Sequence, residues 1–215
     1  MSETMIATLI GSGVTLITTI VTLFINALIE KHKSQLEIEQ KKYEVKREKL
    51  NDIYVKLVDI VNQYPSSSPN DALQYVEHAP NYSMESFDAV LKSLDYQIED
   101  YKKQLNNVNI NYDRKSDVDT KISNREYAKK KISEIRDEYY MARDRYKSFY
   151  KSDKGIFDLY AGQDVRNCLV EFEVIINNVF ISGYSVDDVD DPLNNRIEII
   201  RRKLINSMRN DIGTY

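Results

Sequence analysis

The sequence contains few of the residues from which catalytic and metal sites are built. In 215 residues there are two histidines, His32 and His78, and one cysteine, Cys168. There is no glycine-rich phosphate loop, no paired Cys or His at metal-ligand spacing and no nucleophile motif. We therefore expect a protein that is not an enzyme and that uses no metal and no cofactor. Cys168 lies in an apolar run and is expected to be a buried, inert thiol, in keeping with a reducing compartment.

One acidic cluster is the nearest approach to a cation site: Asp187, Asp188, Asp190 and Asp191. It lacks the central glycine and the closing bidentate glutamate of a calcium-binding EF-hand loop. The cluster is instead expected to be a solvated linker, in which Asp191 and Pro192 begin the last helix.

Glycine and proline are also scarce, with six and four residues, while Lys, Glu, Asp, Asn, Ile and Leu are abundant. This composition suits long helices and predicts an all-α fold. The formal net charge of −4 is small for the chain length. No global field therefore marks the chain as a nucleic-acid binder, and any charge-based partner must use a local patch.

The segment from Thr4 to Ile29 contains no charged residue. A helix over it would be roughly 37 Å long, enough to cross a hydrocarbon core of about 30 Å. No basic residue precedes it and no small-residue cleavage pattern follows it, so we expect a retained membrane span rather than a signal peptide. Lysines follow the segment closely, beginning with Lys31. The positive-inside rule then places the N-terminus outside and the body in the cytoplasm.

Polar residues in this segment recur at steps of four and three residues, which places them on one helix face. Such a stripe favours contact with other membrane helices, and with one span per chain the partners must be other chains. The sequence predicts a homo-oligomer in which this face lines either a water-filled pore or a dry seam. The stripe consists of Thr8, Ser12, Thr15, Thr19, Thr22 and Asn26.

The same seven-residue phase continues beyond the predicted membrane span, and nothing breaks the helix before Tyr64-Pro65. We expect a juxtamembrane coiled coil that connects the cytoplasmic region mechanically to the membrane. The expected divisions are a transmembrane segment (1–30), a coiled-coil helix (31–64) and a cytoplasmic helical bundle (65–215). The coiled-coil face consists of Ile29, Leu36, Tyr43, Leu50 and Leu57.

Within the cytoplasmic region, apolar periodicity and turn residues predict five helices. A short one over 69–79 precedes an antiparallel pair over about 83–105 and 116–152. A more apolar helix after Gly155, centred on Phe172 and ending near Ser182-Gly183, is expected to form the core. The last helix is expected to begin at Asp191-Pro192.

A basic stripe with one aromatic residue runs along the predicted helix 116–152, beside its apolar face. Such a stripe could bind phosphate groups of a nucleotide or oligonucleotide. Acidic residues on the same helix, including Glu134 and Asp137, would neutralise part of its field, and a merely solvated face is the alternative. The stripe consists of Arg125, Lys129, Arg136, Tyr140, Arg143 and Lys147; a smaller basic group is formed by Arg201, Arg202, Lys203 and Arg209.

In its layout, a polar-striped span followed by a helical cytoplasmic body, the chain resembles the single-span effectors of bacterial anti-phage systems, such as the Hailong effector. This resemblance covers the architecture alone and no residue-specific motif. It implies a channel or membrane-disrupting effector of the bacterial cell membrane that is gated by its cytoplasmic domain in response to a nucleotide or oligonucleotide signal. The alternatives are a membrane-anchored coiled-coil scaffold of the cell envelope and a phage-encoded membrane or exclusion protein.

Overall fold

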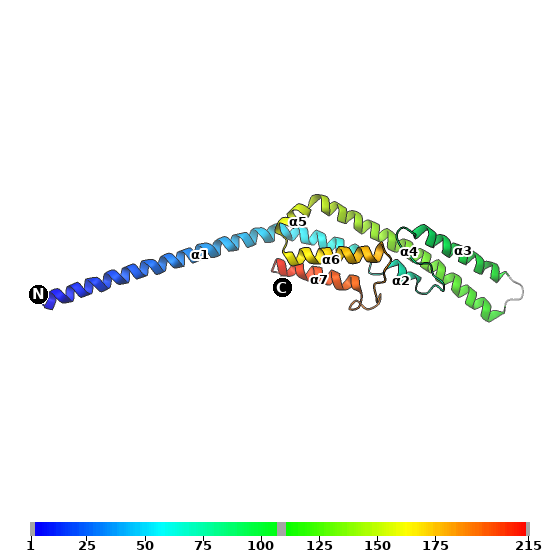
Figure 1. Ribbon diagram of the computed structural model, residues 1–215, viewed down its shortest axis with the longest axis horizontal. Coiled ribbons are helices and arrows are strands. Elements are labelled where there is room, and N and C mark those ends of the chain that lie inside the picture. Colours follow the sequence, from blue (N-terminus) through cyan, green and yellow to red (C-terminus); the bar gives the residue numbers. More distant parts are fainter. Residues whose placement is uncertain (1–2, 107–110, 214–215) are drawn as a thin grey trace. The chain divides into compact units, whose positions relative to one another are not determined.

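The computed structural model describes the backbone of residues 3–106 and 111–213 and the side chains of residues 18–106 and 111–213. Within these ranges the secondary structure consists of seven helices and no strand (Figure 1), which confirms the all-α prediction. The helices are α1 (Glu3–Gln63), α2 (Pro69–Leu73), α3 (Phe87–Leu105), α4 (Tyr112–Ser152), α5 (Lys154–Tyr160), α6 (Gln163–Phe180) and α7 (Arg196–Asp211).

Helix α1 is a single uninterrupted helix of 61 residues. It ends before Tyr64-Pro65, where proline disfavours the helical conformation of the residue that precedes it. Contacts divide the chain into two compact units, Met1–Glu48 and Lys49–Tyr215. The last part of α1 therefore belongs to the helical bundle, whereas the sequence predicted that the bundle begins at residue 65.

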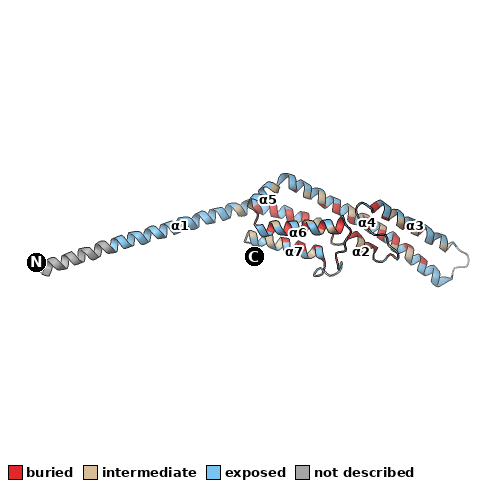
Figure 2. Cartoon of the chain, viewed as in Figure 1, coloured by how far each residue is buried: buried red, intermediate tan, exposed pale blue. Residues whose placement is uncertain are grey.

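The described side chains of α1 before Lys46 are exposed (Figure 2), and many of them are apolar, including Leu23, Phe24 and Leu28. No helix offers a stretch that is both long and apolar enough to cross a membrane within the part of the chain that the structure describes. The first part of the predicted span, up to residue 17, lies outside the described side chains.

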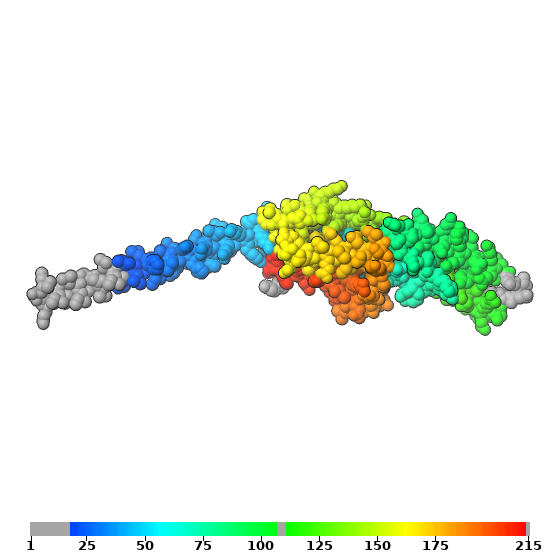
Figure 3. All heavy atoms as spheres, in the orientation of Figure 1, coloured from blue at the N-terminus to red at the C-terminus, as the bar shows by residue number. Residues whose placement is uncertain are grey.

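The larger hydrophobic core lies between the end of α1, the C-terminal half of α4, and helices α5, α6 and α7. Helix α6 contributes most of one face to it, as the sequence predicted, and α6 and α7 lie side by side (Figure 3). From α1 the core receives Leu50, Ile53, Tyr54, Leu57, Ile60 and Val61.

A second core lies between α2, α3 and the N-terminal half of α4. It includes Leu73, Phe87, Leu94 and Ile132. Helix α2 begins after a capping box formed by Ser68 and ends at Leu73, earlier than the predicted Ala79. Helices α3 and α4 form the expected antiparallel pair, and of the polar turn region between them, residues 106–111, positions 107–110 lie outside the described residues.

The last helix begins at Arg196 rather than at Asp191-Pro192. The Asn195 side chain caps it by accepting hydrogen bonds from the backbone N–H groups of Ile197 and Glu198. Asp191 and Pro192 lie instead in the turn that leads to this cap, where the Asp191 carboxylate accepts the N–H of Leu193. The prediction was wrong because an Asp-Pro pair, although typical of a helix start, here forms the turn that precedes the helix.

Candidate functional site

The polar stripe of the predicted membrane span is described only in part. Thr8, Ser12 and Thr15 lie outside the described side chains, whereas Thr19, Thr22 and Asn26 are exposed on α1. The hydroxyl of Thr22 donates a hydrogen bond of 2.8 Å to the carbonyl oxygen of Thr18, one turn earlier. This hydroxyl is thus satisfied within its own helix.

The residues of the predicted coiled-coil face lie in two different environments. Ile29, Leu36 and Tyr43 are about half exposed. Leu50 and Leu57 are fully buried in the larger core of the bundle. The coiled-coil interpretation does not extend to Leu50 and Leu57, because both are buried in the core of their own chain.

The N-terminal end of the predicted basic stripe is not at the surface. Arg125 is 1% exposed, and its guanidinium donates to the side chain of Gln97 at 2.6 Å and to the carbonyl oxygens of Lys121 at 2.9 Å and Glu77 at 2.8 Å. It also stacks over the ring of Tyr101. Arg125 therefore fastens the segment after α2 to the pair α3–α4, and it is not available to a ligand.

The middle of the stripe is occupied by contacts within the chain. Lys129 forms an ion pair with Asp95 of α3. The guanidinium carbon of Arg136 lies 3.7 Å from the centre of the Phe87 ring, and Arg136 also contacts Asp137. These interactions hold α3 against α4, so they favour a structural role for this part of the stripe.

The C-terminal end of the stripe borders a cleft of about 230 Å³ between the end of α1, α4 and α6. We call it the tyrosine cleft. Tyr140 lies at the edge of this region, where its hydroxyl contacts the sulfur of Met84 at 3.3 Å and its ring lies below Arg143. The residues that line the cleft are Tyr64, Tyr139, Arg143, Tyr146, Lys147, Tyr150, Phe172, Glu173, Ile176 and Asn177.

Burial is the main influence on the titration of the tyrosines in the cleft. It raises the pKa of Tyr64, Tyr139 and Tyr146 above the ordinary value of a phenol. The hydroxyl of Tyr146 also donates a hydrogen bond to the carboxylate of Glu173, which raises the pKa of Tyr146 further. These rings are therefore neutral and aromatic at physiological pH, and the cations of the cleft come from Arg143 and Lys147.

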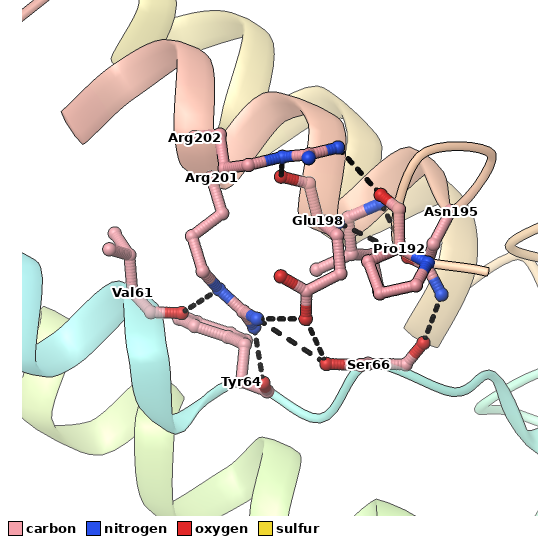
Figure 4. A network of polar contacts seen from close by, with 9 residues as sticks. Val61, Tyr64, Ser66, Pro192, Asn195, Glu198, Arg201 and Arg202 are labelled. Carbon is pink, nitrogen blue, oxygen red and sulfur yellow. Dashed lines mark hydrogen bonds and ion pairs between the residues drawn. The ribbon is translucent and has the colours of Figure 1, made fainter. Parts of the chain in front are cut away.

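A buried polar network fixes the C-terminal end of α1 to α7 (Figure 4). Arg201, 8% exposed, donates hydrogen bonds to the carbonyl oxygens of Val61 at 3.1 Å and Tyr64 at 2.7 Å. It also forms an ion pair with Glu198, and Ser66 donates to the same carboxylate. We call this set the Arg201 clamp; it occupies carbonyl groups that the end of a helix would otherwise leave unsatisfied.

The clamp shows why the second predicted basic group does not form a patch. Arg201 is buried, Arg202 donates to the carbonyl oxygen of Pro192 at 2.6 Å, and Lys203 forms an ion pair with Glu171. Arg201 could not be predicted to bind the end of α1, because Val61 and Tyr64 accept through backbone atoms.

The other candidate groups of the sequence analysis are Cys168 and the acidic cluster. Cys168 is buried at the base of an open groove between α6 and α7. In the described part of the chain, no three His, Cys, Asp or Glu side chains are placed to hold a metal ion. In the acidic cluster, Asp188 accepts backbone N–H groups of Asp190 and Asp191, and Asp187 pairs with Arg196.

No protein-family model, curated protein or solved structure matches this chain. Function is therefore inferred from the residues and their contacts.

Proposed function

We propose that this protein is a homo-oligomeric, single-pass membrane effector that forms a channel or disrupts the membrane, and that its helical bundle controls this activity. The observation that carries the proposal is that α1 extends without a break from Glu3 to Gln63 and is held at its C-terminal end by the Arg201 clamp. A change in the bundle would thus act directly on the helix that carries the uncharged segment.

Membrane insertion is supported by the sequence from Thr4 to Ile29, which has no charge. The exposed apolar side chains of α1 support it further, since Leu23 and Phe24 are 63% and 66% exposed. Apolar surface of this kind requires lipid or another protein chain. The lysines after Ile29 favour a cytoplasmic position for the bundle.

Self-association is supported by the heptad phase outside the bundle. Ile29, Leu36 and Tyr43 share one face of α1 and are exposed. A second copy of the chain that presents the same face would cover them. Because Leu50 is buried in its own bundle, we expect the contact between copies to end before Lys49.

Control by the bundle is supported by three contacts that α1 makes within it. Besides the clamp, the hydroxyl of Tyr54 donates to Asp211 at 2.6 Å, and Lys56 forms an ion pair with Asp153 at 3.1 Å. For the controlling partner we propose an anionic ligand, a nucleotide or oligonucleotide. Of the predicted basic stripe, Arg143 and Lys147 are the cations that border an open cleft.

The membrane activity is tested by expressing the protein in bacteria and following membrane potential with a voltage-sensitive dye. We expect the protein to depolarise the membrane, either when it is expressed alone or when it is freed from a natural inhibitor. Thr22→Leu combined with Asn26→Leu should suppress it, because apolar side chains close or dewet a polar path. The matched control is Ile20→Leu with Phe24→Leu, on the opposite face of α1, which should depolarise like the parent.

Full depolarisation by the Thr22 and Asn26 variant would contradict the pore-lining role of the polar stripe. Equal loss with both pairs would indicate general misfolding. A membrane-anchored scaffold or a phage exclusion protein is the alternative function, and it needs the exposed coiled-coil face but no polar stripe. Absence of depolarisation in every condition, with the oligomer intact, would favour that alternative.

A further inference from the structure

The tyrosine cleft combines aromatic walls with a cation that lacks a carboxylate partner. Arg143 is half-buried and lies over Tyr140, with its guanidinium carbon 5.9 Å from the ring centre. Among the described residues, no Asp or Glu forms an ion pair with Arg143, whereas Lys129, Arg136, Lys147 and Lys154 all have acidic partners. A guanidinium of this kind is the group best suited to bind a planar or tetrahedral anion.

The walls of the cleft are suited to a flat ring. Tyr146 and Tyr150 meet edge to face, with ring centres 5.8 Å apart, and Tyr150 is half exposed. Phe172 packs edge to face on Tyr64 deeper in the cleft. The volume of about 230 Å³ is below the range of about 300–1,000 Å³ that is usual for drug-sized ligands, so the cleft holds about one ring, and the rest of a larger ligand would lie outside it.

We propose that the tyrosine cleft binds a planar ring that bears a phosphate or carboxylate group. The ring stacks on Tyr150 and Tyr146, and the anionic group is bound by Arg143 and Lys147. The carboxamide of Asn177, which also lines the cleft, recognises polar atoms on the edge of the ring.

The same cleft is connected to the end of α1 through one residue. The side chain of Tyr64 lines the cleft, and the carbonyl oxygen of Tyr64 accepts the 2.7 Å hydrogen bond from Arg201. A ligand that orders Tyr64 therefore stabilises the Arg201 clamp and the last turn of α1. The role of this ligand as the controlling signal rests on the function proposed above, whereas its binding to the cleft does not.

Binding is tested with the whole purified protein by isothermal titration and by saturation-transfer NMR of the ligand. The probes are phenyl phosphate, which has both ring and anion, phenol, which has the ring alone, and inorganic phosphate. We expect phenyl phosphate to bind about tenfold or more tightly than either of the others, since each part of the probe contributes separately. Equal affinities for phenyl phosphate and inorganic phosphate would overturn the proposal.

Two variants and two controls locate the site. Arg143→Gln and Tyr150→Ala should each weaken phenyl phosphate binding about tenfold. Arg145→Gln and Tyr112→Ala, which alter exposed residues of the same helix outside the cleft, should change it by less than about twofold. Circular dichroism establishes that all four variants are folded. Equal binding by folded Arg143→Gln and Arg145→Gln proteins would overturn the assignment.

Adenosine monophosphate and 4-aminobenzoate distinguish the source of the ring and the anion. Tighter binding of the first identifies a nucleotide, and tighter binding of the second identifies an aromatic carboxylate. Hydrogen exchange at residues 60–64 tests the connection to α1, and we expect it to slow when the preferred probe is bound. Binding with unchanged exchange there would overturn the connection. Because none of these measurements uses membrane potential, failure of the channel proposal would leave their outcome unaffected.

Discussion

Arg201 of α7 donates a 2.7 Å hydrogen bond to the carbonyl oxygen of Tyr64, the residue directly after the end of α1. The two residues are 137 positions apart in the sequence. Their contact closes the bundle around the last turns of α1, and it predicts a measurable loss of stability when the guanidinium is removed.

We expect Arg201→Ala to lower the free energy of unfolding of the bundle by about 3 kcal/mol, because Glu198 and two backbone carbonyl groups lose a buried donor. Arg202→Ala removes the neighbouring, exposed guanidinium and should cost less than about 1 kcal/mol. Urea denaturation followed by circular dichroism measures both. Similar losses for the two variants would show that the clamp does not stabilise the bundle.

The clamp should also make stability depend on pH. Burial alone would raise the pKa of Glu198, but hydrogen bonds from Ser66 and Arg201 and the charge of Arg201 together hold the pKa below its ordinary value of 4.5. A lowered pKa in the folded state gives a stabilisation that is present above the unfolded pKa and is lost as pH falls through the folded pKa.

Thermal unfolding between pH 7 and pH 3 tests this dependence, with Glu198→Gln as the variant. We expect the variant to be less stable than the parent at pH 7, and the difference to shrink below about pH 4.5. A difference that stayed constant over the whole range would indicate that the Glu198 charge does not contribute.

Positions of one heptad phase should respond differently on the two sides of Lys49. Leu57→Ala removes a fully buried side chain and should destabilise the bundle by about 2–5 kcal/mol. Leu36→Ala with Tyr43→Ala alters exposed residues, so it should leave unfolding of the bundle nearly unchanged and weaken the homo-oligomer. Denaturation and native mass spectrometry measure the two properties. If Leu57→Ala lost the oligomer without losing stability, Leu57 would be a contact between chains after all.

Arg125 provides a fourth prediction, at the other end of α4. Arg125→Gln cannot reach all the acceptors that the guanidinium satisfies, and we expect a loss of about 2–3 kcal/mol. Hydrogen exchange should increase in the segment 74–80, which Arg125 holds through the carbonyl oxygen of Glu77. Arg145→Gln is the matched control, and exchange in that segment should be unchanged. Equal exchange in both variants would contradict the role of Arg125 in fastening this segment.

The helices could be predicted because their apolar periodicity reflects one physical cause, burial of a single face. In α4 this periodicity comprises Ala128, Ile132, Ile135, Tyr139, Ala142, Tyr146 and Phe149, and all of them are buried except Tyr146, which is half-buried. The pattern of one helix does not reveal what covers that face. Leu50 and Leu57 fit a contact between chains as well as a contact within one chain, and three-dimensional packing decides between them.

The basic stripe shows that the pattern of one helix also does not reveal what covers its polar residues. Arg125 and Arg143 lie in one phase of α4, yet Arg125 is enclosed by α3 and the segment after α2, while Arg143 borders a cleft. Spacing along the helix could not distinguish them, because the covering elements come from elsewhere in the sequence. The tyrosine cleft was not predicted for the same reason, since its walls come from α4, α6 and Tyr64, the residue after the end of α1.

Helix α4 supplies consecutive turns to the larger core and to the second core, with Ala128 and Ile132 in the second and Ile135 and Tyr139 in the larger one. Neither core can lose its packing without exposing a turn of helix that adjoins the other core. Melting should therefore proceed as a single cooperative transition over residues 49–213. For the same reason the two cores are not separable modules. A fragment cut near the middle of α4 would leave both halves without part of their core, so the bundle folds and unfolds as one unit.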